Sequence, residues 1–183
     1  MIKAWILVAG AAVQTILTAA TPSPTCGTFQ GCPEEGQPPS IWAVLKNRCR
    51  PVDCPSTFSV KDAIAWPASR SMADGVKVIG WLVAAQRSDT ESCNCNLRSL
   101  RDTHLWLGDR ANARKKDCMV VETTPRWQAF DTTLAWPNVG RFVGKKVSVT
   151  GYPFLDPEHS YEVGRTRATQ WEVHPVTRIE VVQ

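Results

Sequence analysis

The sequence ESCNCNLRSLRDTHLWL, residues 91–107, joins a polar loop with two cysteines to a stretch in which polar and apolar residues alternate. This alternation has the period of two that is typical of a β-strand with one buried face. It places Leu105 and Leu107 toward a core, and His104 and Trp106 on the opposite face. We therefore expect a β-structure that is built around this strand and the polar loop before it.

Four further segments have the composition and period of strands, and they lie at residues 75–84, 118–123, 146–152 and 169–181. Residues 126–136 have helical composition and lie between Pro125 and Pro137. Five strands with one helix between the third and fourth are the order of an OB fold, a partly open Greek-key barrel. A small β-sandwich is the alternative, but Gly80 within the long first strand favours a barrel, whose strands must bend sharply.

The first twenty residues, 1–20, have the features of a secretory signal peptide. Lys3 supplies a positive start, and the apolar run that follows is too short to span a bilayer and ends in small residues. We expect a mature chain that begins near Thr21, has no membrane span and is secreted or periplasmic. An uncleaved anchor or a lipid-modified Cys26 is the alternative.

Residues 21–70 are expected to form an arm that contains cysteines and prolines and precedes the barrel. Ser40 is a suitable cap for a short helix over residues 41–48, and a second short helix is expected at residues 59–66. The barrel domain is then predicted over residues 71–183.

Charge and cysteine content restrict the classes of function. A formal net charge of +4 over 183 residues is too small to indicate nucleic-acid binding by itself. Seven cysteines in an exported chain indicate disulfides, and the odd number leaves at least one thiol outside them. Short separations predict local bridges of Cys26 with Cys32 and of Cys49 with Cys54.

The three remaining cysteines lie in or near the polar loop. Cys93 and Cys95 are two residues apart, so a bridge between them would be strained, and one of them is expected to pair with Cys118. A zinc site formed by these three cysteines and His104 is a second interpretation, although its spacing matches no standard zinc motif.

Five segments of the chain resemble a set of uncharacterised bacterial secreted proteins. They are ESCNC at 91–95, DTHLWL at 102–107, ETTPR at 122–126, DPEH at 156–159 and WEVHPVT at 171–177. The resemblance implies an OB-like barrel and no particular catalytic residues. The expected fold is also similar to that of secreted thermonucleases, but their metal-ligand and arginine motifs do not match this sequence residue by residue.

The expected ligand site is the mouth of the barrel. OB folds usually bind their ligands on the face of strands two and three, between the loop joining strands one and two and the loop joining strands four and five. Here these loops are residues 87–101 and 156–167, and ordinary hydrophilic connections are the alternative interpretation. The candidate ligand-binding residues are Glu91, Asn94, Asn96, Trp106, Glu158, His159, Arg165 and Arg167.

Histidines and carboxylates share the polar faces of two predicted strands. Asp102 and His104 lie on one face of strand two, and His174 lies with Glu172 on one face of strand five. Because neutral imidazole binds divalent metal ions and a carboxylate can orient its second nitrogen, Asp102, His104 and His174 are candidate metal ligands. Ordinary surface histidines are the alternative. The candidate catalytic residues are Asp102, His104, His174, Arg126, Arg165 and Arg167.

No familiar catalytic motif accompanies these residues, since H-E-x-x-H, G-x-S-x-G and the P-loop pattern are missing. A basic segment at residues 110–116, close to Trp106, is suited to single-stranded nucleic acid or an anionic glycan. We therefore expect a secreted OB-fold module that binds an anionic or polar ligand. The alternatives are a metal-assisted hydrolase of phosphodiesters, in which arginines stabilise negative charge, and a disulfide-stapled envelope protein.

Overall fold

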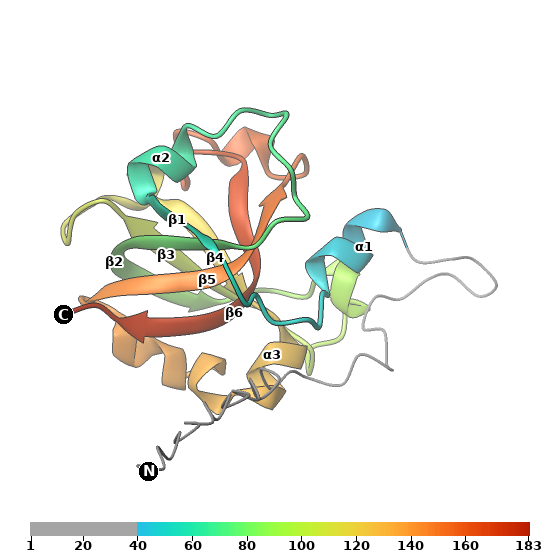
Figure 1. Cartoon of the computed structure of the whole chain (residues 1–183). Coiled ribbons are helices and arrows are strands. Elements are labelled where there is room, and N and C mark those ends of the chain that lie inside the picture. The colour runs from blue at the N-terminus through green and yellow to red at the C-terminus, as the bar shows by residue number, and fades with distance from the viewer. Residues whose placement is uncertain (1–39) are drawn as a thin grey trace, which may run out of the picture.

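The computed structural model describes residues 40–183, so the predicted signal peptide and the predicted Cys26–Cys32 bridge lie outside the described residues. Figure 1 shows a barrel of strands with helices at two opposite ends and along one side. Within residues 40–183, no helix has the length and apolar character needed to cross a membrane.

Five strands close into a barrel. They are β2 (Val76–Arg87), β3 (Thr103–Gly108), β4 (Met119–Thr123), β5 (Lys146–Leu155) and β6 (Trp171–Val181). Their spatial order is β2-β3-β4-β6-β5, and pairing of β5 with β2 closes the barrel. β4 and β6 are parallel, whereas the other neighbouring pairs of the barrel are antiparallel. Because the fourth barrel strand returns beside the first, this is a Greek-key barrel, and the predicted OB-like fold is confirmed.

Apolar side chains that alternate along the strands fill the barrel. Leu105 and Leu107 are fully buried in the main core cluster, which confirms the register predicted for their strand. Gly80 lies where two segments approach β2 closely. A Cβ atom at this position would lie 2.4 Å from a Val60 methyl group and 2.7 Å from the Gly108 carbonyl oxygen. A larger residue would therefore force these neighbours away from the strand.

The connection between β4 and β5 is helical only at its start. It contains α3 (Pro125–Phe130), η3 (Thr132–Leu134) and η4 (Asn138–Phe142), the last two being 3-10 turns. α3 ends where Asp131 adopts an extended conformation and its side chain accepts a hydrogen bond from the Thr133 amide, which begins the next turn. The helix predicted over residues 126–136 is therefore present but shorter than expected.

The segment before the barrel contributes to its core. It contains α1 (Ile41–Lys46), β1 (Ser56–Ser59) and α2 (Val60–Ile64). β1 pairs in parallel with the first part of β2, and Ser59 caps α2 through a capping box with Asp62. Val60 and Trp66 lie in the core cluster. α2 lies over the upper end of the barrel in Figure 1. Residues 56–66 thus complete a barrel that the sequence pattern placed only from residue 71 onward.

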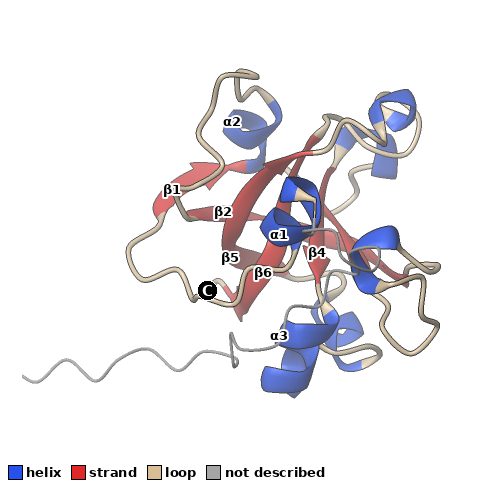
Figure 2. Cartoon of the chain, turned by 90° about the vertical axis from the view of Figure 1, so that its right-hand side faces the viewer, coloured by secondary structure: helices blue, strands red, loops and turns tan. Residues whose placement is uncertain are grey.

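α1 lies beside the barrel, on the side that faces the viewer in Figure 2. The Trp42 ring meets Phe154 of β5 edge to face, with the ring centroids 5.8 Å apart. Just after α1, the Asn47 side-chain amide donates a hydrogen bond of 3.0 Å to the Cys93 carbonyl. These contacts hold α1 against the polar loop between β2 and β3 and against the end of β5.

The cysteines differ from the predicted pairing. Cys49 and Cys95 are disulfide-bonded, whereas Cys54, Cys93 and Cys118 are free thiols. The predicted Cys49–Cys54 bridge is therefore wrong, because Cys54 is exposed and unpaired. A bridge from the polar loop to Cys118 is also wrong, because Cys118 is buried in a separate apolar cluster. The zinc site expected from these thiols and His104 is not assembled, since Cys95 is oxidised and Cys118 lies elsewhere.

Candidate functional site

Carboxylates and histidines gather on the outer face of β3, β4 and β6. They alternate with core residues along each strand, so they point away from the barrel interior. His104 of β3 is the register partner of Glu122 of β4, and β6 pairs with β4 and contributes Glu172 and His174. The loop between β2 and β3 and the loop between β5 and β6 supply the remaining side chains. We call this set the carboxylate–histidine cluster, and its members are Glu91, Asp102, His104, Glu122, Asp156, His159, Glu172 and His174.

His174 lies at the centre of the cluster and is fully buried. Its Nδ1 atom lies 3.2 Å from Glu122 Oε2 and 3.5 Å from Glu172 Oε2, and its Nε2 atom lies 3.4 Å from Asp102 Oδ2. None of these contacts has hydrogen-bond geometry, so neither ring nitrogen has a hydrogen-bond partner among residues 40–183. A buried imidazole surrounded by carboxylates in this way requires a positive charge, from a proton or from a metal ion.

Glu122 connects His174 to a second histidine. Its Oε1 atom lies 3.4 Å from His104 Nε2, and the same nitrogen lies 3.1 Å from Glu91 Oε1. The side chain of His104 is 24% exposed and that of Glu91 is 19% exposed. This pair therefore forms the boundary between the buried cluster and solvent.

The loop between β2 and β3 is folded tightly around Asp102. It contains the 3-10 turn η1 (Ser92–Asn94), which ends at Cys95 and Asn96 in the left-handed conformation, with φ of 65° and 51°. Asn94 is fully buried, and its side-chain amide donates a hydrogen bond of 2.8 Å to Asp102 Oδ1. One oxygen of Asp102 is thereby fixed, and the other faces His174.

The loop between β5 and β6, which contains the 3-10 turn η5 (Ser160–Glu162), completes the cluster. Arg167 is buried and donates to Glu172 and Glu162, each at 3.1 Å. Asp156 is buried beside His159 and lies 4.0 Å from the ammonium group of Lys46 in α1. This half of the cluster therefore contains two permanently charged cations.

The electrostatics of the cluster favour cations strongly. Burial lowers the pKa of His174, but the carboxylates of Glu122, Asp102 and Glu172 raise it to about 10. Burial also lowers the pKa of His104, and Glu122 and Glu91 raise it to about 11. Burial raises the pKa of Asp102 to about 7. At neutral pH both histidines are thus held as cations unless another cation replaces their protons.

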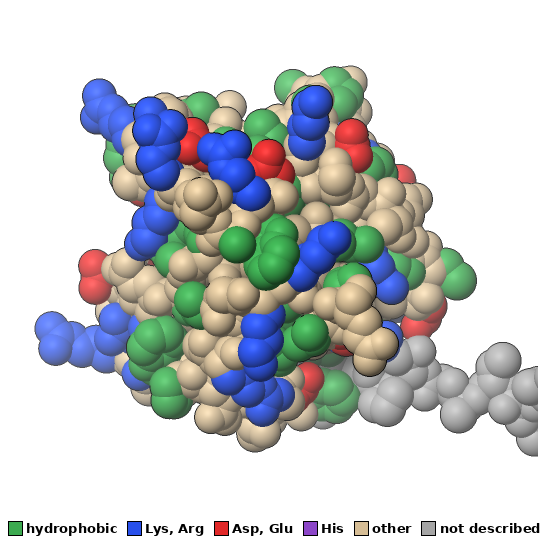
Figure 3. Space-filling view, turned by 90° about the vertical axis from the view of Figure 1, so that its left-hand side faces the viewer, with side chains coloured by type: hydrophobic (Ala, Val, Ile, Leu, Met, Phe, Trp, Pro, Cys, Tyr) green, Lys and Arg blue, Asp and Glu red, His purple; other side chains and the backbone are tan. Residues whose placement is uncertain are grey.

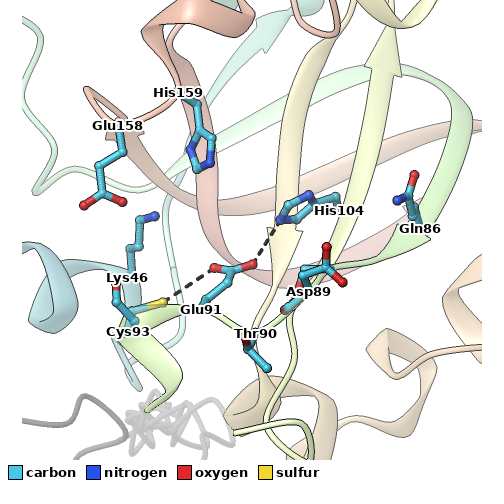
Figure 4. A pocket seen from close by; sticks show the side chains of 11 residues that line it. Lys46, Gln86, Asp89, Thr90, Glu91, Cys93, His104, Glu158 and His159 are labelled. Atoms are coloured by element: carbon cyan, nitrogen blue, oxygen red, sulfur yellow. Dashed lines mark hydrogen bonds and ion pairs between the residues drawn. The ribbon is translucent and has the colours of Figure 1, made fainter. Parts of the chain in front are cut away.

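A pocket of about 350 Å³ opens next to the cluster. Figure 4 shows Glu91, His104, His159 and Lys46 around this cavity, and the dashed lines join Glu91 to His104 and to the Cys93 thiol. The other lining residues are Gln86, Ser88, Asp89, Thr90, Ser92 and Glu158.

On the face that lies to the left in Figure 1, Lys and Arg are widespread and no histidine is visible (Figure 3).

Several predicted site residues meet at this place. Asp102, His104 and His174 lie in one cluster, and Glu158 and His159 line the pocket beside it. Their roles in binding or catalysis stay predictions.

Other predicted site residues lie away from the cluster or have no surface free for a ligand. Arg126 is buried in α3, and Asn96 and Arg165 are exposed. Trp106 is only 7% exposed, its ring is covered by the Lys115 ammonium at 3.6 Å, and its N–H donates to a backbone carbonyl. Arg167 is occupied by buried carboxylates, so neither it nor Trp106 presents a free surface to a ligand.

Glu122, Asp156, Glu172 and Lys46 were not among the candidate site residues predicted from the sequence. Glu122 alternates with Val121 along β4, and this period could have placed it on the polar face. Lys46 belongs to α1, which the sequence pattern assigned to a separate arm. No local signal indicates that its ammonium group approaches Asp156, which lies 4.0 Å away in the structure.

Comparisons with known proteins give little further information. No family model matches this chain, and no curated protein matches it. One match among solved structures is to a chain in the crystal structure of yeast Stn1 and Ten1, with 17% sequence identity and a TM-score of 0.35. It covers 60% of this chain and 43% of that chain. The site must therefore be interpreted from its own geometry.

Proposed function

We propose that this protein binds a divalent metal ion in the carboxylate–histidine cluster and uses the ion to hold an anionic ligand in the adjoining pocket. The observation that carries the proposal is the environment of His174. Its two ring nitrogens, fully buried, lie 3.2–3.5 Å from the carboxylate oxygens of Asp102, Glu122 and Glu172 without forming hydrogen bonds.

The charges of the cluster support a bound cation. The five carboxylates of the cluster and Glu162 lie around two cations, Lys46 and Arg167, so four negative charges remain when the histidines are neutral and every carboxyl group is ionised. Isolated charges are costly in a buried site, and a divalent ion would offset part of this excess.

The spacing of the side chains is also suitable for metal ligands. Zinc bonds to imidazole nitrogen and carboxylate oxygen are about 2.0–2.2 Å long, which places adjacent ligand atoms about 3–3.5 Å apart. His104 Nε2 lies 3.1 Å from Glu91 and 3.4 Å from Glu122, which is the spacing of ligands on one ion. At His174 the two contacts involve different ring nitrogens, Nδ1 at 3.2 Å from Glu122 and Nε2 at 3.4 Å from Asp102, so one ion could use only one of these nitrogens. Oxygen and imidazole ligands fit zinc and manganese better than soft thiophilic ions.

The pocket indicates an anionic ligand that depends on the metal ion. Asp89, Glu91 and Glu158 line it together with Lys46, His104 and His159, so its walls carry both negative and positive groups. A divalent ion at His104 would add positive charge at the wall of the pocket. Lys115 adds positive charge nearby, since its ammonium group covers Trp106, whose ring centroid lies 6.3 Å from that of His104.

Hydrolysis of a phosphodiester is the second candidate function. A metal ion lowers the pKa of bound water and stabilises negative charge on a phosphoryl group. His104 is partly exposed at the pocket and lies 3.1 Å from Glu91, so a metal ion held by these two side chains would be open to a water molecule and to a phosphate ester. This specific contact favours hydrolysis over a purely structural role in the cell envelope.

Metal content is the direct test. The full chain, purified without added metal, is analysed for bound ions and then titrated with Zn²⁺ and Mn²⁺ after chelation. We expect tight binding that is lost in His174→Ala and kept in Val173→Ala, a matched variant that shortens the neighbouring buried side chain on the core face. Equal binding by the two variants, or no binding by the wild type, would overturn the proposal.

Ligand binding and hydrolysis are then measured on the loaded protein. Single-stranded oligonucleotides and acidic glycans are titrated with and without metal across a salt series, and bis(p-nitrophenyl) phosphate is used as a hydrolysis substrate. Metal-dependent binding supports the proposal, and turnover lost in His104→Ala supports the hydrolase. Binding that does not change on chelation would contradict a metal-held ligand.

Export to an oxidising compartment stays a prediction. The disulfide-bonded state of Cys49 and Cys95 supports it, because disulfides are rare in reducing compartments. Amino-terminal sequencing of the mature protein tests it, and we expect a start near Thr21.

A further inference from the structure

We infer that the carboxylate–histidine cluster holds two metal ions that share Glu122 as a bridging ligand. The inner ion would be bound by Asp102, Glu122 and His174, and the outer ion by Glu91, His104 and Glu122. This inference rests on the proposed function. It adds the number of ions, their ligands and the position that remains open to a phosphate ester.

Glu122 has the geometry of a bridge. Its two oxygens face different histidines, since Oε1 lies 3.4 Å from His104 Nε2 and Oε2 lies 3.2 Å from His174 Nδ1. In each of the two ligand sets, the three candidate ligand atoms lie within 4.8 Å of one another. A carboxylate has enough lone pairs to bind one ion through each oxygen.

The inner set contains polar atoms that the described residues leave without hydrogen bonds. These are Asp102 Oδ2, Glu122 Oε2 and both ring nitrogens of His174, on side chains that are between 0 and 3% exposed. Buried polar atoms without partners are rare in folded proteins and call for an explanation such as a bound ion. Asn94 holds the other oxygen of Asp102, as residues around a metal ligand commonly do.

The outer set is open to solvent, whereas the inner set is buried. Glu91 and His104 are partly exposed and line the pocket, so an ion there would keep coordination positions for water or for a ligand. Two ions about 3.5–4 Å apart are a recurrent device for binding the oxygens of a phosphoryl group and stabilising its displacement. The open position at the pocket therefore indicates a phosphate ester as the ligand.

The charge of the cluster agrees with two ions. Four negative charges remain when Lys46 and Arg167 are set against the five carboxylates of the cluster and Glu162, so one divalent ion leaves an excess of two negative charges. A second ion makes the site neutral. Two ions would thus remove the net negative charge that opposes binding of a phosphate ester.

A third set, formed by Asp156, His159 and Glu172, also has ligand-like spacing. We do not assign an ion to it, because its carboxylates are already neutralised. Arg167 lies 3.1 Å from Glu172 and 3.8 Å from Asp156, and Lys46 lies 4.0 Å from Asp156.

Titration with Mn²⁺ tests the pair of ions. The full chain is stripped with a chelator, titrated by calorimetry, and examined by electron paramagnetic resonance at two equivalents of Mn²⁺. We expect two ions per chain and a spectrum with magnetic coupling between them. His104→Ala should bind one ion with an uncoupled spectrum, and the exposed control Glu180→Gln should behave like the wild type.

The outcomes separate this inference from the proposed function. One ion in the wild type, two ions without coupling, or two ions in His104→Ala would overturn the bridged pair and leave a metal centre in place. No bound ion would overturn both. Glu122→Gln gives a second measurement, since loss of coupling in this variant supports the bridge and retained coupling contradicts it. Far-UV circular dichroism checks that each variant is folded.

Discussion

Replacing His174 by alanine in the metal-free protein removes the cation that faces three buried carboxyl groups. Its ring nitrogens lie 3.2–3.5 Å from oxygens of Asp102, Glu122 and Glu172. Removing one partner of a buried ion pair costs about 3–5 kcal/mol, because the remaining charge stays buried without compensation. We expect the free energy of unfolding at pH 6 to fall by about this amount. In a chain of this size, that corresponds to a decrease of about 6–20 °C in Tm.

The decrease in the free energy of unfolding caused by His174→Ala should become smaller as the pH rises. Burial lowers the pKa of His174, but Glu122, Asp102 and Glu172 raise it to about 10, above its ordinary value of 6.5. A group whose pKa is raised on folding stabilises the protein fully below its unfolded pKa, and this contribution disappears as the pH rises through the folded pKa. The difference between wild type and variant should therefore decrease between pH 6.5 and pH 10.

Urea unfolding followed by tryptophan fluorescence, with chelator present, measures this difference at pH 6 and pH 9. Val173→Ala is the control, because it removes buried apolar atoms and should cost the same stability at both pH values. A loss below about 1 kcal/mol for His174→Ala at pH 6, or an equal loss at pH 9, would refute the reasoning, since either result would mean that His174 is not held as a buried cation.

Three further predictions concern the barrel and its thiols. Leu105→Ala, at a fully buried position, should lower the free energy of unfolding by about 2–5 kcal/mol in urea, and a smaller loss than for His104→Ala would contradict the register of β3. Gly151→Ala should lower Tm in thermal melts, because its Cβ would lie 2.3 Å from a carbonyl oxygen of β6, and an unchanged Tm would show that the strands can separate there. In the native protein, iodoacetamide should modify the exposed Cys54 and spare the buried Cys118, whose pKa is raised by burial to about 11. Peptide mass spectrometry checks this, and rapid modification of Cys118 would indicate local opening.

Local sequence patterns were sufficient to predict the barrel. In residues 102–107 the alternation of side chains is a property of extended backbone, and burial of Leu105 and Leu107 permits only one register. The same alternation placed His104 and His174 on polar faces of their strands. Turn-forming residues and prolines then divided the chain into five strands and a helix in the OB order.

The tertiary structure decided which polar residues meet. A period of two shows which face of a strand a side chain occupies, but its neighbour depends on how the strands pair. Glu122 faces His104 because of the register between β3 and β4, and Lys46 approaches Asp156 because α1 packs against the barrel.

The disulfides and the buried state of the cluster likewise depended on packing. Cysteine spacing cannot determine connectivity, and the predicted bridge to Cys54 failed for this reason. His174 was predicted on a polar face, and alternation alone cannot distinguish a polar face open to solvent from one covered by other elements. Here α1 and the two polar loops cover that face and bury the carboxylates and histidines. Because unpaired negative charge is costly when buried, the cluster binds protons or other cations strongly.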